Sequence, residues 1–148
     1  VTLAVLWPVA LTLVLVRIGK VGLWPQRMLP ATFITIAPPS VLALSGVQLG
    51  APDVLVHMLW GVALLFTGVS MTVFKRSLAQ PFGMSFWGLS FPLAAFSALT
   101  LRLASTPGGD WLQLPALGAL ALTSLVILSL TLGTWRGLRN GSLLVADA

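Results

Sequence analysis

Side chains able to do chemistry are scarce in this chain, and two of them stand close together. His57 is the single histidine and follows Asp53 by four residues, while the chain has three carboxylate side chains and no cysteine. Residues four apart meet on one face of a helix, so this pair could bind and release a proton together. A histidine that only makes a hydrogen bond at a helix end is the alternative. A haem or metal site would need further strong ligands, so we expect no cofactor and no metal.

A different constellation surrounds Phe91, within the apolar run of residues 82–104. On a helix, Phe91 shares one face with small residues at three- and four-residue steps. These are Gly88, Ala95 and Ala98, with Arg102 at the end of the same face. One interpretation is a narrow, largely uncharged pore that the Phe91 ring blocks. The other is that the small residues allow close helix packing, with Phe91 in contact with lipid or with the core.

Three prolines interrupt the predicted helices near their middles, at Pro38, Pro39 and Pro92. Each lacks a backbone N–H and presses its ring against the carbonyl one turn earlier, which predicts a kink. In lipid the freed carbonyls need protein or water as partners, so the prolines favour a bundle interior or a wet cavity. A packing kink with no role in transport is the alternative.

The elements that position these residues are predicted to be membrane helices. The chain is 57% apolar and only 7% charged, and its mean hydropathy is +1.02, far from a soluble domain of this size. We expect no enzyme, because no pair of acids, Ser–His arrangement or metal cluster can be assembled from these residues. The net charge of +5 indicates orientation in the membrane, and no nucleic-acid partner is expected.

Five apolar spans approach the length that a bilayer requires. They cover residues 1–16, 30–49, 52–74, 82–104 and 111–135. This pattern predicts an all-α polytopic membrane protein with one transmembrane region over residues 1–148. Because Val1 already lies inside an apolar run, we expect the chain to be the carboxy-terminal part of a longer protein.

Basic residues collect in alternate loops between the spans. Seven of the eight fall on one side, namely Arg17, Lys20, Arg27, Lys75, Arg76, Arg136 and Arg139. The opposite loops contain Asp53 and Asp110, with Arg102 just before one of them. The positive-inside rule therefore predicts a multi-pass protein of the inner or plasma membrane with a cytoplasmic carboxy terminus.

The sequence also repeats itself. LWPVAL at residues 6–11 returns as LWGVAL at residues 59–64, and the same offset pairs Pro39 with Pro92 and Phe33 with Phe86. Apolar sequences match by coincidence, but agreement of two helices at one offset favours a repeat. The unit would be a helical hairpin, with spans one plus two and spans three plus four as successive copies. The offset transfers the Phe91 face to Thr35, Pro38, Leu42 and Ser45.

Two runs carry a resemblance to a known family. They are LPATFITIAPPSVLAL at residues 29–44 and KRSLAQPFGMSFWGLSFPLAAFSALTLRLA at residues 75–104. Their most specific motifs are Ala37-Pro38-Pro39, Phe86-Trp87 and Ser90-Phe91-Pro92. With these motifs the chain resembles the tellurite-resistance/dicarboxylate transporter family, which includes bacterial TehA-like channels and the plant slow anion channels. The resemblance extends more weakly over all five spans.

The resemblance implies ten membrane helices built from five hairpins, with alternate inner helices around a pore and three protomers in a trimer. This chain would supply the last five helices, of which its second and fourth are inner ones. In such channels a phenylalanine of the ninth helix occludes the pore, and by motif position it corresponds to Phe91. The other residues of the Phe91 face and its transferred copy would then line the pore.

The leading hypothesis is a passive anion channel or secondary carrier, with the lipid bilayer and small anions as partners. The anion stays open among dicarboxylates such as malate, sulfite, tellurite-related species, chloride and nitrate. One alternative is a proton-coupled dicarboxylate carrier that uses His57 or Asp53. Another is a membrane anchor or cofactor subunit without transport.

Overall fold

The computed structural model describes residues 2–22, 33–78, 82 and 84–141. In these residues the regular structure is helical throughout, as the composition predicts. The α-helices are α1 (Thr2–Val21), α2 (Ala37–Gln48), α3 (Asp53–Leu78), α4 (Ser90–Ala104) and α5 (Gln113–Arg139). Two short 3₁₀ segments are η2 (Met84–Leu89) and η3 (Asp110–Leu112).

Both α2 and α4 begin where a 3₁₀ segment gives way to α-helix. Residues 33–36 form one such segment before α2, and η2 precedes α4. The two changes occur at Ala37 and Ser90, which are 53 positions apart and so match the sequence repeat. Pro38 lies at the start of α2 and Pro92 is the third residue of α4. A proline is tolerated there because the first N–H groups of a helix have no intrahelical acceptor.

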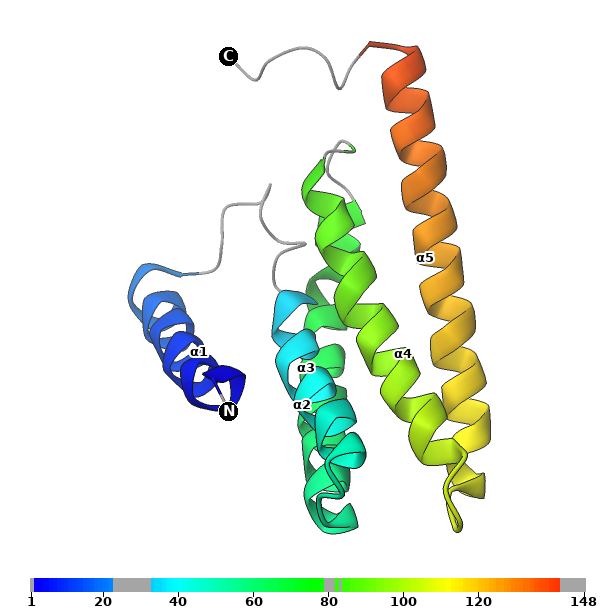
Figure 1. Ribbon diagram of the computed structural model, residues 1–148. Coiled ribbons are helices and arrows are strands. Elements are labelled where there is room, and N and C mark those ends of the chain that lie inside the picture. The colour runs from blue at the N-terminus through cyan, green and yellow to red at the C-terminus, as the bar shows by residue number, and fades with distance from the viewer. Residues whose placement is uncertain (1, 23–32, 79–81, 83, 142–148) are drawn as a thin grey trace.

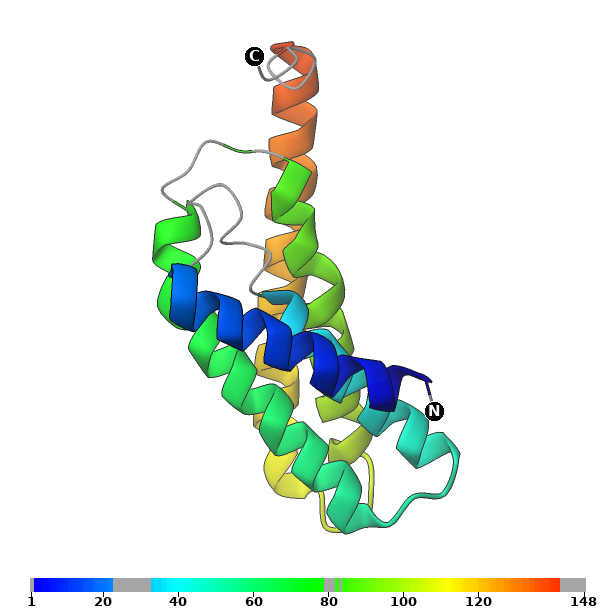
Figure 2. The same ribbon diagram turned by 90° about the vertical axis from the view of Figure 1, so that its left-hand side faces the viewer.

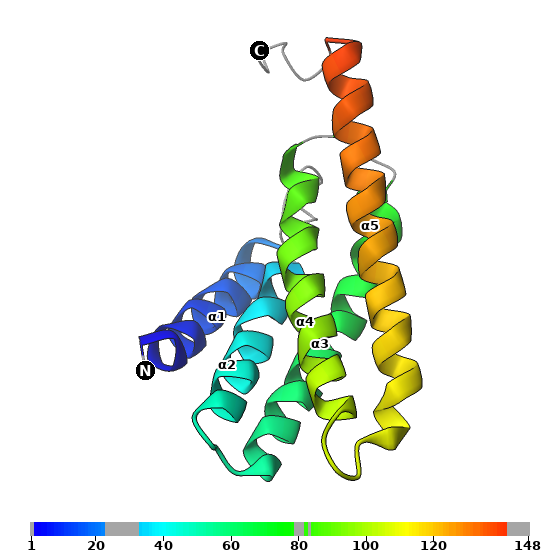
Figure 3. The same ribbon diagram turned by 45° about the vertical axis from the view of Figure 1, so that its right-hand side comes forward.

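The main bundle consists of α2, α3, α4 and α5 (Figure 1). α2 and α4 lie side by side, α3 packs against α2, and α5 packs against α4. Figure 3 shows α4 between α2 and α5. α1 contacts α2 from the side and crosses the bundle obliquely in Figure 2. The Trp7 ring of α1 also packs edge-on against Phe66 of α3, with 6.4 Å between ring centroids.

Among the described residues, three helical stretches are long and apolar enough to cross a membrane. These are Asp53–Thr72, Ser85–Ala104 and Asp110–Arg139, while Phe33–Gln48 is a shorter apolar helix. Inside the molecule 56% of the Ser85–Ala104 window is buried, against 17% of each of the other two. α4 is therefore the central helix of the bundle, and α3 and α5 are outer ones. The count of five spans stays a prediction.

The closest hairpins are not the ones that the sequence analysis predicts. Among sequential helices, α2–α3 and α4–α5 have the most extensive contacts, and α1–α2 and α3–α4 have fewer. The short turns after Gln48 and Ala104 explain this, because a short connection holds neighbouring helices antiparallel and in contact. The packed hairpins are thus shifted by one helix from the predicted units, which were spans one plus two and spans three plus four. The 53-residue offset still relates α1 to α3 and α2 to α4.

Several helix ends differ from the predicted loops. Arg17 and Lys20 lie inside α1, which ends at Gly22 with a left-handed φ of 88° that favours glycine. The backbone of Lys75 and Arg76 belongs to α3. The last turn of α5 contains the remaining basic pair, Arg136 and Arg139. Basic side chains stabilise the carboxyl end of a helix, so these helices extend beyond their apolar spans.

Some of the predicted features lie outside the described residues. They are Arg27 and the start of the second span at residues 30–32.

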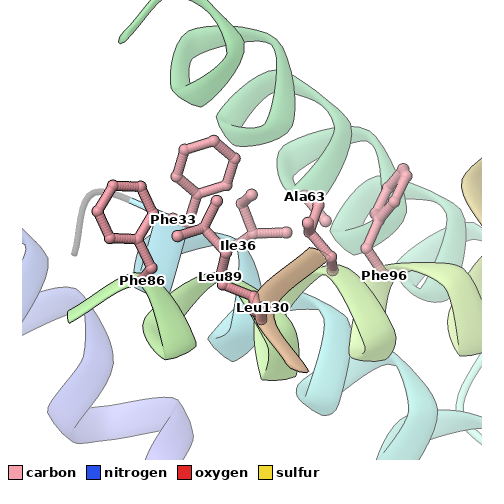
Figure 4. Close-up of a cluster of buried hydrophobic side chains, with 8 residues drawn as sticks. Phe33, Ile36, Ala63, Phe86, Leu89, Phe96 and Leu130 are labelled. Atoms are coloured by element: carbon pink, nitrogen blue, oxygen red, sulfur yellow. The ribbon is translucent and has the colours of Figure 1, made fainter. Parts of the chain in front are cut away.

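The core at the η2 end of the bundle joins both copies of the repeat (Figure 4). Phe33 and Ile36 are fully buried, and their repeat partners Phe86 and Leu89 are 8% and 2% exposed. Ala63, Leu93, Phe96 and Leu130 complete this cluster. Matching positions of the two inner helices therefore face one shared core, which supports the repeat. In a membrane such a core stabilises the bundle through close packing, because lipid tails are as apolar as these side chains.

A close approach of α5 to the η2 end gives a test of this packing. A Cβ on Gly133 would lie 2.7 Å from the ring of Phe82, which stacks on Phe86 with centroids 5.8 Å apart. Since the stacked ring has little freedom to move, we expect Gly133→Ala to destabilise the protein by about 1–3 kcal/mol. Thermal unfolding of the purified protein in detergent measures this.

Gly118→Ala, on the same helix, is the matched control. Nothing lies within 4 Å of its added Cβ, and alanine favours helix over glycine. The control should therefore melt at or above the temperature of the parent. Equal melting temperatures for the two variants would contradict the described packing at Gly133.

Candidate functional site

α4 has a covered face and an open face. The covered side chains are Pro92, Leu93, Ala95, Phe96, Ser97, Leu99, Thr100 and Leu103. On the open face Phe91 is 64% exposed, Ala98 and Arg102 are also exposed, and Gly88 is half-buried. Most of a phenyl ring in the central helix is thus left uncovered by the described elements. This is the face that the sequence analysis singles out.

α2 has a matching open face. Ser45 is exposed, whereas Thr35, Pro38 and Leu42 are half-buried. α3 packs against α2, α5 packs against α4, and α2 and α4 lie side by side. We call these two faces together the open face.

One predicted member is placed differently. Ala95 is only 8% exposed, so a neighbouring element already covers it. A position at the edge of the open face explains this, because Ala95 is rotated by about 40° from Phe91 at 100° per residue. Its role as a lining residue stays a prediction.

Pro38 belongs to the α2 part of the open face, and Pro39 and Pro92 lie beside it. Pro39 and Pro92 are both fully buried, and Pro38 is half-buried. Ser40 also bonds back to the Ile36 carbonyl, with 2.8 Å between Oγ and O. This bond satisfies the buried Ser40 hydroxyl within its own helix. The prolines therefore mark the change from 3₁₀ to α-helix, and a kink as such stays a prediction.

The structure brings His57 to the backbone of Asp53. The ring Nδ1 lies 2.8 Å from the Asp53 carbonyl oxygen, and both residues are exposed at the start of α3. A carbonyl only accepts, so Nδ1 carries the hydrogen in this contact. The Asp53 carboxylate is not the partner here, and α3 does not belong to the open face. A proton-linked role for the pair stays a prediction.

Charged side chains gather at opposite ends of the bundle. The turns after α2 and α4 lie at one end, with Asp53, Asp110 and Arg102 (Figure 1). Arg136 and Arg139 lie at the other end. Arg102 is thus the one basic residue of the open face, and it lies at the end where the described carboxylates are found.

Polar contacts between helices are the feature that sequence reasoning missed. Trp60 of α3 donates from Nε1 to Thr100 Oγ1 at 3.1 Å, and Thr100 donates to the Phe96 carbonyl at 2.8 Å. The Trp60 ring also packs edge-on against Trp111, with centroids 5.8 Å apart. Hydroxyls within apolar spans were the available signal, since they commonly link membrane helices. Their partners lie 40 residues away and have no local pattern.

The helical bundle and its membrane-capable helices define a helical membrane protein. The chain belongs to the family described as voltage-dependent anion channel, SLAC1, which matches residues 4–134. No curated protein and no solved structure matches the chain. The family match confirms the resemblance to TehA-like channels and plant slow anion channels, and it supports anion transport in a membrane.

The absence of cysteine allows the open face to be probed by single cysteines in a cysteine-free full-length protein. We expect Ala98→Cys and Ser45→Cys to react with a membrane-impermeant methanethiosulfonate, because a water-filled path would reach both. Leu125→Cys, at an exposed apolar position of α5, and Leu99→Cys, at a buried one, should be protected. The labelling rate measures this, and protection of all four positions would contradict a wet open face.

Proposed function

We propose that the open face is one wall of an anion-conducting pore. The observation that carries this proposal is the exposed Phe91 on the most buried helix of the bundle. Neighbouring helices would normally cover an aromatic ring on the central helix of a membrane bundle. The exposed ring therefore indicates that this side faces water or further protein. Membership of an anion-channel family supports the water-filled alternative.

Phe91 would act as a steric and dewetting gate. Its neighbours on the face are small, Gly88 and Ala98, so the ring is the largest side chain of the face between these two positions. A narrow apolar constriction conducts poorly because water and ions leave it. Rotation of the ring or a small movement of its segment would open the path.

Weak anion binding would fit rapid passage. Between Gly88 and Ala98 the open face of α4 has no charged side chain, and the hydroxyl of Ser45 lies on the α2 part. Channels conduct when binding is strong enough for entry and weak enough for release. Arg102, at one end of the face, would raise the local anion concentration at that mouth.

The remaining wall would come from the parent protein. We propose that inner helices outside this sequence close the pore and that three copies assemble into a trimer with one pore each. The end with Arg136 and Arg139 would face the cytoplasm, because the positive-inside rule favours it. Arg102 would then lie at the outer mouth.

The gate is tested by Phe91→Ala in the full-length protein. We expect anion flux to rise on the order of tenfold, the change produced by lowering a barrier by about 1.4 kcal/mol. Phe91→Leu should give an intermediate flux, because the smaller side chain still narrows the path. Electrophysiology or vesicle flux, normalised to the amount of protein in the membrane, measures both.

Leu128→Ala is the matched control for Phe91→Ala. Leu128 is 56% exposed on the outer helix α5, so its truncation should leave flux unchanged. Unaltered flux in Phe91→Ala, with normal expression, would remove the gate. Saturable uptake driven by a pH gradient and lost in His57→Gln would instead indicate the proton-coupled carrier.

The outer-mouth charge is tested by Arg102→Gln. We expect anion conductance to fall about twofold at low ionic strength and to return to the parent value at high salt, because salt screens an exposed charge. Arg139→Gln removes the same charge at the other end of the bundle, away from the open face. An equal, salt-dependent loss in both variants would show that net charge, and not the position of Arg102, is responsible.

A further inference from the structure

The segment around Phe91, from Trp87 to Ser97, is joined to α5 by two side-chain hydrogen bonds. Before Phe91, Trp87 donates from Nε1 to Thr134 Oγ1 at 3.0 Å. After it, Ser97 Oγ and Thr123 Oγ1 lie 2.7 Å apart. The two contacts are 10 residues apart on the gate side and 11 apart on α5, as expected for antiparallel neighbours. Phe91 therefore lies between two anchors to one outer helix.

The segment between the anchors is the least regular part of this helix. It contains the change from 3₁₀ to α-helix at Ser90 and Pro92, which has no N–H to bond the carbonyl one turn earlier. Fewer backbone hydrogen bonds hold such a junction than hold a continuous α-helix. Contacts to α5 therefore have a larger share in fixing the position of Phe91 than they would on a regular helix.

The Ser97–Thr123 contact belongs to a complete hydrogen-bond chain. Thr123 Oγ1 donates to the Leu93 carbonyl at 3.3 Å, which leaves Ser97 as the donor to Thr123. Ser97 is 3% and Thr123 5% exposed. Loss of the Thr123 hydroxyl would leave the Ser97 hydroxyl to find another buried partner, which costs more than loss of an exposed bond.

The Trp87–Thr134 contact has the same order of donors and acceptors but is more exposed, with Trp87 36% exposed. Thr134 accepts from the indole and donates to the Leu130 carbonyl at 2.9 Å. On the opposite side of α4, about 180° from Phe91 at 100° per residue, Thr100 accepts from Trp60 of α3. Because this opposite side of α4 is bonded to α3, the whole helix resists rotation about its own axis. Movement at the gate is then confined to the Phe91 ring and the short segment between the anchors.

From this arrangement we infer that Thr123 and Thr134 are positioning residues for the gate, which hold Phe91 in the closed position through Ser97 and Trp87. This inference rests on the proposed function of Phe91. Release of either anchor loosens the segment, so the ring leaves the pore more often. The effect acts through Phe91 and is absent when the ring is absent.

The experiment is a double-mutant cycle in the full-length protein. Thr123→Val keeps the shape of the side chain and removes the hydroxyl. We expect it to raise basal anion flux about threefold, which corresponds to the free energy of one hydrogen bond between membrane helices. In the Phe91→Ala background it should not raise flux further. Thr123→Ser, which keeps the hydroxyl, should restore the parent flux. Thr134→Val tests the second anchor in the same way and serves if Thr123→Val does not fold.

Thr131→Val is the matched control, because Thr131 lies on α5, is exposed, and bonds to the Ile127 carbonyl of its own helix at 2.9 Å. Its flux should equal that of the parent. Unchanged or lowered flux in Thr123→Val and Thr134→Val, or equal increases with and without the Phe91 ring, would overturn the inference. If Phe91→Ala itself leaves flux unchanged, the proposed gate fails instead, so the two failures are distinguishable.

Discussion

Three missing backbone N–H groups, those of Pro38, Pro39 and Pro92, set the geometry on which this bundle depends. In an apolar medium each backbone polar group needs a partner within the protein, so a helix containing proline must adjust locally. Here the adjustment is a 3₁₀ segment that ends just before the proline turn, once before α2 and once before α4. The same adjustment at both places keeps Phe33 and Phe86 in one core.

Polar side chains add hydrogen bonds between these elements, beside the backbone hydrogen bonds of the helices. Thr100, Thr123 and Thr134 each donate to a backbone carbonyl and accept from a side chain of another element. Such relays leave no hydroxyl of these three unpaired. They tie α4 to α3 and α5, and η2 to α5. An inner helix with one bound side and one open side is suited to a pore wall, because the wall must be rigid while the lining stays free.

The difference between the bonded side and the open side of α4 connects the fold to anion passage in the voltage-dependent anion channel family. The open face offers small side chains, one aromatic ring and one terminal cation. An anion would meet little fixed charge along it and would be held only briefly. In the proposed pore the obstacle to flow would be the Phe91 ring, and the contacts behind it would set its position.

The sequence alone determined the helical class, the repeat, the candidate Phe91 face and the family resemblance. These follow from composition, from an exact 53-residue offset and from motifs such as Ser90-Phe91-Pro92, all of which are local in the chain. Apolar spans have little amphipathic contrast, so the covered and open faces of α4 could be told apart only by packing, which buries Ala95 and exposes Phe91. The shifted hairpin frame and the Ser97–Thr123 contact likewise depend on distant segments meeting. Only the tertiary structure decided these features, because hydrogen bonds between helices have no sequence period.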